Sequence, residues 1–212
     1  LDAVKIRSGL NNFERAKTVV QTERTPKLTG GELIPSIVQS LNENRTIKFE
    51  YKKFDDSQSK TIILEPHLLK EDRHRWYVIG RLEKYPDPTT TYALDRMTSI
   101  ELLDIKFTPI NFNFEEYYRY SFGITVPKED PIEVILSFTP TQGNYLKTLK
   151  IHPTQTQLID NDIEYRISIT VKPSWEFYEK ILGYGNTVKV LSPDAVIKSF
   201  KQKLKLMSEY YL

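Results

Sequence analysis

The basic side chains between positions 67 and 81 have the clearest potential for chemistry. Within these fifteen positions only Glu71 and Asp72 oppose them, while Tyr77 lies among them and Tyr92 follows. The basic residues are His67, Lys70, Arg73, His74, Arg75 and Arg81. Guanidinium groups beside exposed aromatic rings suit a phosphodiester ligand, because arginine pairs with phosphate and the rings stack on bases. This segment therefore predicts a binding site for a nucleic acid or a nucleotide.

Arg96 extends the predicted site, because it directly follows the next predicted strand. If the strands that carry these residues are neighbours in one sheet, their side chains can converge on one rim. Simpler interpretations stay open for individual residues. Arg73 and His74 are typical of a solvated loop, and Arg96 has Asp95 and Glu101 nearby as partners for a structural ion pair.

The sequence lacks the motifs of the common enzyme classes. It has no cysteine, so thiol nucleophiles, disulfides and thiolate zinc sites are excluded. Its 8 glycines form neither a phosphate-binding loop nor the Gly-x-Ser-x-Gly turn of serine hydrolases. We interpret Asp55-Asp56 as a polar turn and His152 as a structural or surface residue. We therefore expect no enzyme, no metal site and no cofactor.

Composition places the chain among ordinary globular proteins. Its 212 residues are 39% hydrophobic and 12% aromatic, and the formal net charge is +2, so any affinity for nucleic acid must come from a local patch. No run approaches the roughly 18 apolar residues that a membrane-spanning helix needs. The chain begins with Leu1 and shows no signal peptide, so we expect a cytoplasmic protein whose natural start is missing.

Residues 1–44 are expected to form a helical connector. In its second half, apolar residues recur at helical spacing from Leu33 to Leu41, and Pro35 marks the start of that helix. From Arg45 the period changes to two, which is typical of a half-buried strand.

Residues 45–126 are expected to form a small barrel domain. Five short strands joined by tight turns favour a barrel. We place these strands at about 45–52, 61–65, 75–82, 90–94 and 97–105. Pro66 is expected to end the second strand, and Pro86-Asp87-Pro88 is expected to form the turn before the fourth.

Residues 127–212 are expected to form a second domain with the element order βαββαβ, as in a ferredoxin-like fold, which makes the fold class α+β. Its second helix begins near Ser174 and is expected to turn Trp175 inward. A last helix opens near Asp194 and carries an apolar stripe at helical spacing. The stripe consists of Ile197, Phe200, Leu204, Met207 and Tyr211. It fits either core packing or a dimer seam.

Several short motifs resemble the WYL domain. The triplet Trp76-Tyr77-Val78, within Arg75–Gly80, is similar to the Trp-Tyr-Leu after which the domain is named. The preceding segment Leu64–Glu71 fits the same resemblance. Tyr92–Met97 looks like the family's later Leu-Asp-Arg-Ile element, and Ile47–Tyr51 looks like its first strand.

The second half resembles the WCX extension that follows many WYL domains. Ile181–Gly185, Val188–Leu191 and Pro193 carry this resemblance, which together with the WYL motifs covers about residues 30–212. It implies a Sm-like, SH3-type five-stranded barrel for the first domain and a ferredoxin-like fold for the second.

The resemblance also implies a function. WYL proteins are mostly bacterial transcriptional regulators with an N-terminal winged helix-turn-helix, and they commonly form homodimers. Their WYL domain senses a ligand, in several cases a nucleic acid or nucleotide, through a basic pocket. Tyr77 and Arg96 match pocket positions, and Arg75 and Arg81 flank the triplet. This sequence departs from the family near Tyr92, where a further arginine is often found.

We therefore expect the ligand-sensing and dimerisation part of a transcriptional regulator. A nucleic acid or nucleotide would bind on the basic rim, and operator DNA would be bound by an N-terminal domain that this chain lacks. Two alternatives stay open. The chain is a dimerisation or protein-interaction module without a ligand, or an accessory domain of a nucleic-acid-processing system.

Overall fold

The computed structural model describes residues 29–211, and the chain divides into two compact units, Leu1–Phe107 and Thr108–Leu212. Each unit has its own sheet and its own hydrophobic core. The connector helices expected in residues 1–27 lie outside the described residues. None of the described helices is long and apolar enough to cross a membrane.

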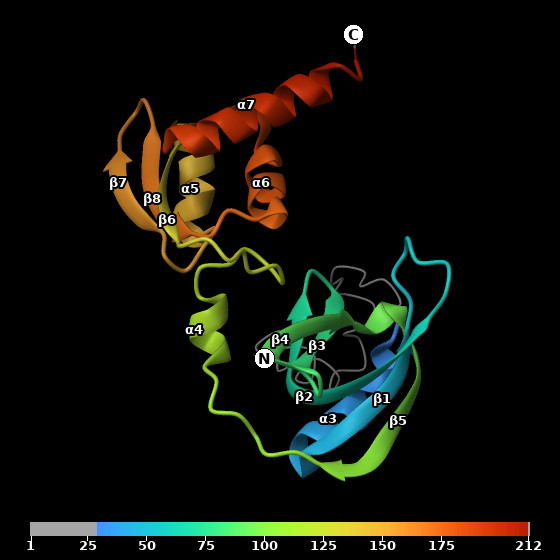
Figure 1. Cartoon of the computed structure of the whole chain (residues 1–212). Coiled ribbons are helices and arrows are strands. Elements are labelled where there is room, and N and C mark those ends of the chain that lie inside the picture. The colour runs from blue at the N-terminus through green and yellow to red at the C-terminus, as the bar shows by residue number, and fades with distance from the viewer. Residues whose placement is uncertain (1–28, 212) are drawn as a thin grey trace, which may run out of the picture. The chain divides into compact units, whose positions relative to one another are not determined.

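Five antiparallel strands form the sheet of the first unit, as the sequence predicts (Figure 1). They are β1 (Arg45–Tyr51), β2 (Lys60–Asp72), β3 (Arg75–Leu82), β4 (Tyr85–Ala93) and β5 (Met97–Lys106). Their order is β4-β3-β2-β1-β5, which leaves β4 and β5 at the two edges. No pairing joins these two edges within residues 29–211, so a closed barrel is not observed.

Strand β2 does not end at Pro66, contrary to the prediction. It continues to Asp72, and the register with β3 shifts between Pro66 and Leu68. A bulge of this kind accommodates proline inside a sheet, because the missing N–H falls where the ladder is interrupted. Gly80 lies opposite Pro66, and a Cβ on Gly80 would lie 2.2 Å from the carbonyl oxygen of Glu65. Only glycine permits this close approach.

The turn expected at Pro86-Asp87-Pro88 is also wrong, because these residues belong to β4. The connection from β3 is instead the two-residue turn Glu83-Lys84. The register between β3 and β4 shifts here, since Leu82 pairs with Tyr85 and Gly80 pairs with Thr90. The prolines therefore lie in an irregular part of an edge strand, where a missing N–H breaks no ladder bond.

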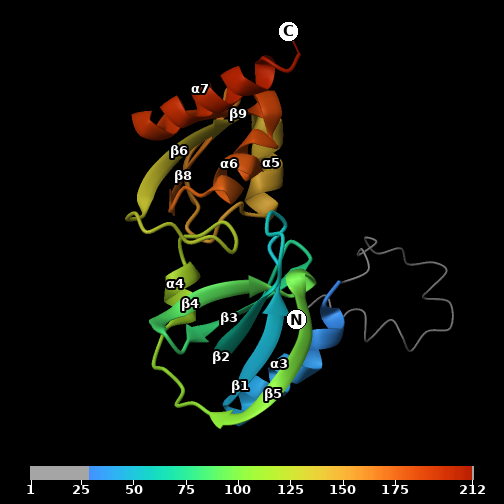
Figure 2. The ribbon, with the colours of Figure 1, turned by 45° about the vertical axis from the view of Figure 1, so that its right-hand side comes forward.

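Helix α3 (Ile34–Glu43) packs against β1, β2 and β5 and follows the short helix η1 (Gly31–Leu33) (Figures 1 and 2). The expected helix and its start at a proline are thus confirmed. The core between this helix and the sheet is built from the inward faces of the strands, with Ile37 of α3 and Leu94 of the short helix after β4. It includes Ile37, Ile47, Phe49, Leu64, Val78, Leu94 and Met97. The alternation predicted for β1 is confirmed, since Ile47, Phe49 and Tyr51 are all buried.

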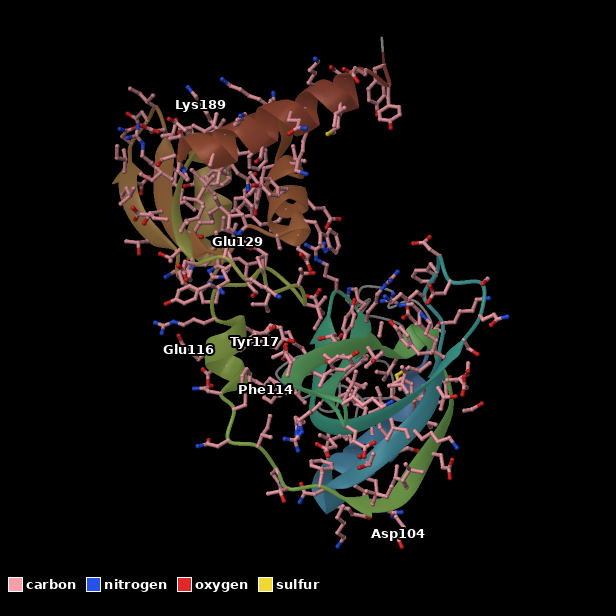
Figure 3. All side chains as sticks on the ribbon, viewed as in Figure 1. Asp104, Phe114, Glu116, Tyr117, Glu129 and Lys189 are labelled. Carbon is pink, nitrogen blue, oxygen red and sulfur yellow. The ribbon has the colours of Figure 1, made fainter. Side chains whose placement is uncertain are left out.

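The second unit has the predicted order strand, helix, strand, strand, helix, strand. The elements are β6 (Ile132–Phe138), α5 (Pro140–Thr148), β7 (Thr156–Asp160), β8 (Tyr165–Val171), α6 (Trp175–Leu182) and β9 (Val188–Ser192). The four strands are antiparallel and lie in the order β7-β8-β6-β9. The short helix α4 (Phe114–Tyr118) precedes them, with Phe114 and Tyr117 on one side and Glu116 on the other (Figure 3).

Local capping explains where the two helices of this unit begin. The Thr139 hydroxyl accepts from the Gln142 N–H, and the Ser174 hydroxyl accepts from the Phe177 N–H. A side-chain oxygen at this position satisfies a backbone donor that the helix leaves unpaired. Trp175 is a correction, because its side chain is 59% exposed rather than inward. Its indole N–H donates to the Thr125 hydroxyl at 3.2 Å.

The last helix, α7 (Asp194–Ser208), is packed only in its first half. Val196 and Phe200 are buried in the core of the second unit, and Phe200 contacts the ring of Tyr178 at 5.1 Å between centroids. Further along, Leu204 is 52% exposed and Met207 is 47% exposed. Core packing therefore explains only the beginning of the predicted apolar stripe.

Candidate ligand-binding site

Three elements of the first unit bring part of the basic segment together. Tyr77 on β3 pairs with Ala93 at the end of β4, and the short helix η2 (Leu94–Arg96) follows at once. The Lys52 N–H donates to the Arg96 carbonyl at 3.2 Å, which fixes the end of β1 beside η2. Arg96 and Tyr77 thus lie near each other although they belong to different elements.

Arg96 is held by aromatic rings. Its guanidinium carbon lies 5.6 Å from the centroid of the Tyr51 ring and 5.1 Å from that of Phe54. Rings at this distance attract a cation through the negative charge of their faces. Tyr51 belongs to the core, whereas Phe54 is 73% exposed. The guanidinium therefore contacts one buried ring and one exposed ring.

Asp95 is the acidic partner of this cluster, but it lies at a distance from both arginines. Its carboxylate is 3.5 Å from Nη1 of Arg75 and 3.7 Å from Nε of Arg96. The Asp95 Oδ1 and the Arg96 Nε are buried and make no hydrogen bond within the described part of the chain. The structural ion pair considered for Arg96 thus exists with Asp95 but is loose, while Glu101 pairs with Lys48 at 3.2 Å.

Electrostatics link Tyr77 to the same cluster. Burial raises the pKa of Tyr77, and Asp72 raises it further, while Arg75 and Arg96 act in the opposite direction. Burial likewise raises the pKa of Tyr51, against the lowering effect of Arg96. Both hydroxyls are therefore protonated at neutral pH and can donate a hydrogen bond. We call Arg75, Tyr77, Asp95 and Arg96, with the rings of Tyr51 and Phe54, the Arg96 cluster.

Tyr92 does not have the exposed position that was expected. It is only 8% exposed, and its ring makes edge contacts with Phe49 and Tyr51 at 5.2 and 4.8 Å between centroids. Alternation along β4 places Tyr92 on the core face, so it cannot stack on a base at the surface. Its ring packs against the Tyr51 ring within the core.

Arg81 lies near the end of β3 and His67 lies on β2, both away from the hairpin turn. The Arg81 Nε donates to the Glu65 carboxylate at 2.6 Å. The His67 ring contacts Phe107 at 5.1 Å between centroids, and burial lowers its pKa, with a further lowering from Arg81. Because a strand rises about 3.3 Å per residue, Arg81 is roughly 20 Å from Arg75 along β3. The structure thus does not unite Arg81 and His67 with the Arg96 cluster.

The remaining predicted residues lie on the hairpin between β2 and β3. Lys70 pairs with Tyr77 across the two strands. Arg73 and His74 form the turn itself, both exposed and both with positive φ, 49° and 63°. Two such residues fit the tight turn that follows the twist of neighbouring strands.

Phe54 and Tyr51 are parts of the Arg96 cluster that sequence reasoning missed. Tyr51 was assigned only to the buried face of a strand. Phe54 carried a usable signal, because it is an aromatic residue inside the polar stretch Lys52–Ser59, where burial is not expected.

The described residues contain no group of three or more histidine, aspartate or glutamate side chains that could hold a metal ion. His152 is buried, as a structural histidine would be. Its Nδ1 lies 2.8 Å from the Thr154 hydroxyl, and its ring stacks at a tilt on Phe122, with 5.0 Å between centroids. Burial lowers the pKa of His152.

Comparison with protein families matches residues 32–102 to the WYL domain and residues 130–208 to the WCX domain. The chain is a WYL domain followed by a WCX domain. The Arg96 cluster lies entirely within the matched WYL region. No curated protein matches the chain.

Two solved structures are similar to this WYL-WCX chain. One is the proteasome accessory factor B/C (PafBC) of Arthrobacter aurescens, with 16% sequence identity and a TM-score of 0.36, covering 88% of this chain and 28% of that one. The other is a CRISPR Cas-related protein, with 11% identity and a TM-score of 0.50, covering 84% of this chain and 50% of that one. The chain therefore spans half or less of either structure, and the second likeness concerns the fold alone.

Proposed function

We propose that this chain is the ligand-sensing module of a transcriptional regulator and binds a phosphate group of a nucleic acid or nucleotide at the Arg96 cluster. Arg96 and Arg75 would bind the phosphate, and Tyr77 would donate a hydrogen bond to it. The module would act as a homodimer and would control operator DNA through a separate DNA-binding domain. Its role is binding rather than catalysis.

The position of Arg96 is the observation that carries this proposal. Its guanidinium is fixed between two rings, while the Nε donor is buried and lacks a hydrogen bond within residues 29–211. A charge-assisted hydrogen bond has a length of about 2.7–2.9 Å, and Asp95 at 3.7 Å does not supply it. The Arg96 side chain is 25% exposed, and a phosphate would bind at its exposed guanidinium nitrogens, where planar pairing would fix the ligand's orientation.

Asp95 would act as a resident counterion. It lies between Arg75 and Arg96, so it lowers the cost of holding two cations together without a ligand. An incoming phosphate must compete with this carboxylate and is also repelled by it. Asp95 thereby favours ligands that can contact both arginines over simple anions that contact only one.

The packing of η2 offers a route from ligand to response. Gly30 has a φ of 82°, and a Cβ there would lie only 2.4 Å from the Leu94 carbonyl oxygen. Arg96 and Leu94 belong to the same three-residue helix, so a shift of Arg96 would also move Leu94. Because Leu94 lies close against Gly30, the backbone at Gly30 would have to move as well. Such a signal requires that the ligand prefer one of two conformations.

We further assign the first unit to an incompletely closed Sm-like, SH3-type barrel and the second to a ferredoxin-like fold. Strand number, sheet order and the short helix between β4 and β5 support the first assignment. The order βαββαβ with β6 and β8 in the centre of the sheet supports the second.

Fluorescence anisotropy with labelled single-stranded DNA and RNA over a salt series tests this function, beside a labelled nucleotide. We expect saturable binding that weakens with salt, because phosphate contacts release counterions. Arg96→Ala should weaken it at least tenfold. Arg81→Ala is the matched control and should stay within twofold of the unmodified chain, since Arg81 is already paired with Glu65.

Two outcomes would overturn the proposal. If Arg96→Ala kept full affinity, the site would lie elsewhere. If no probe bound at low salt, the chain would be better explained as a dimerisation module without a ligand. Far-UV circular dichroism and thermal unfolding of both variants verify that they fold.

A further inference from the structure

An apolar groove lies in the second unit between helix α7 and strand β9, far in the sequence from the Arg96 cluster. It has a volume of about 400 Å³, and the end of α6 contributes to its lining. Figures 1 and 2 show α7 running across this unit to the C-terminus. Ile197, Phe200, Leu204 and Met207 form the α7 wall, and Val188 and Val190 belong to the β9 side.

Strand β9 has an open side at this groove. It lies at the edge of the sheet order, and β6 is its only strand partner among the described residues. The Thr139 N–H donates to the Thr187 carbonyl at 3.0 Å, which fixes which backbone groups face β6. Since these groups alternate along an antiparallel strand, the N–H and carbonyl of Val188 and Val190 point outward. An open edge of this kind is a template for another strand.

The charges around the groove all have one sign. Lys189 and Lys201 are its charged lining residues, and no carboxylate lines it within the described part of the chain. Lys189 belongs to β9 (Figure 3) and pairs with Ser137, so its side chain lies on the sheet face opposite Val188 and Val190, whereas Lys201 belongs to α7 on the groove side. A second copy of the chain placed here would bring its own lysines against these two. Charge complementarity therefore favours an acidic occupant.

We propose that this groove binds a short, extended, acidic segment of a partner protein, which adds to β9 as a fifth strand. Main-chain hydrogen bonds to Val188 and Val190 would hold the segment, and alternate apolar side chains would enter the groove against Leu204 and Met207. The acidic side chains between them would lie on the opposite face of the sheet, where Lys189 is the neighbouring charge. An edge strand beside a helix is the geometry that β-strand addition uses.

The chain offers a matched pair of variants for the test. Leu204 and Leu206 lie on the same helix and are both 52% exposed, but only Leu204 lines the groove. The probe is a fluorescein-labelled eight-residue peptide of alternating glutamate and valine, measured with the full 212-residue chain. Leu204→Glu is expected to weaken binding at least tenfold, whereas Leu206→Glu should leave it within twofold. A peptide of alternating lysine and valine should not bind.

Amide exchange identifies the mode of binding. Strand addition should slow exchange of the Val188 and Val190 amides at least tenfold when the acidic peptide is bound. Absence of peptide binding, equal losses in both leucine variants, or unchanged exchange at β9 would each overturn the proposal. Sedimentation completes the test, because a dimer that Leu204→Glu converts to a monomer, without peptide binding, would assign the groove to a second copy.

Discussion

Two arginines of the first unit are in opposite situations, Arg81 near the end of β3 and Arg96 in the short helix η2. Arg81 donates to Glu65 at 2.6 Å, so its charge is matched at hydrogen-bond distance. Arg96 has a carboxylate only at 3.7 Å and is held in place by two rings. An arginine that already makes a short hydrogen bond to a carboxylate has a structural role. An arginine that is held in place but lacks such a bond can still bind a ligand. Counting basic residues in the sequence does not distinguish the two.

The comparison predicts first a difference in stability between two acidic residues. Glu65→Ala leaves the half-buried Arg81 without its hydrogen bond and should lower the free energy of unfolding by about 1–3 kcal/mol. Asp95→Ala breaks only loose contacts and should cost less than about 1 kcal/mol. Urea unfolding of both variants in a Trp175→Phe background measures this, since Trp76 then reports the first unit alone. Equal losses would remove the distinction between the two arginines.

For ligand affinity the order of the two acidic residues should be reversed, with the larger effect at Asp95 and none at Glu65. Asp95→Asn removes the charge that competes for Arg75 and Arg96, so we expect phosphate-containing probes to bind about three- to tenfold more tightly, a gain of roughly 1 kcal/mol from one removed charge near the surface. Glu65→Gln should not change binding. Anisotropy titrations at one fixed salt concentration give both values. Weaker binding by Asp95→Asn would mean that Asp95 orients the arginines instead of competing with the ligand.

The exposed ring of Phe54 should matter for binding more than for folding. Removing it in Phe54→Ala deletes one cation–π contact, worth about 0.5–1 kcal/mol at an exposed site, and frees the guanidinium to move. We expect affinity to fall about two- to fivefold with little change in thermal stability. Tyr85→Ala is the control, because Tyr85 is 63% exposed and lies outside the Arg96 cluster. Similar losses in both variants would point to a general surface effect.

The smallest expected effect concerns pH at the Arg81 end. Burial lowers the pKa of His67 in the folded chain, with Arg81 acting in the same direction. Below the usual histidine value of about 6.5 the unfolded chain therefore binds more protons, so this contribution to stability is present above that pH and is lost on acidification. The urea midpoint of the first unit should fall less between pH 7.5 and 5.5 in His67→Gln than in the unmodified chain.

His152 provides the matched control for this pH effect. Its pKa is also lowered by burial, but it belongs to the second unit. His152→Gln should therefore leave the pH dependence of the first unit unchanged. If His67→Gln kept the full dependence, other groups would have to carry it.

Local patterns in the sequence predicted most elements of the fold. Period-two alternation predicted β1, helical spacing predicted α3 and α7, and Ser174 marked the start of α6. Pro66 and the prolines of β4 were misjudged. Whether a strand tolerates proline depends on a bulge or an edge, and both are properties of the assembled sheet.

The candidate site was predictable only in part, for a similar reason. Tyr77, Arg75 and Arg96 were found, because they are close to each other once β3 and β4 pair. Tyr92 was wrongly expected at the surface. The alternation of side chains along a strand separates two faces of the sheet, but it does not show which face is buried. Phe54 was missed because its contact with Arg96 joins segments more than forty residues apart.

The prolines of strand β4 have a consequence for the behaviour of the protein in concentrated solution. Pro86 and Pro88 lie in an edge strand of nine residues, and neither has an N–H to offer. A neighbouring molecule that tried to extend the sheet at β4 would meet gaps in the row of donors. This edge is thereby protected against open-ended stacking of one chain on the next, the first step toward fibrillar aggregates.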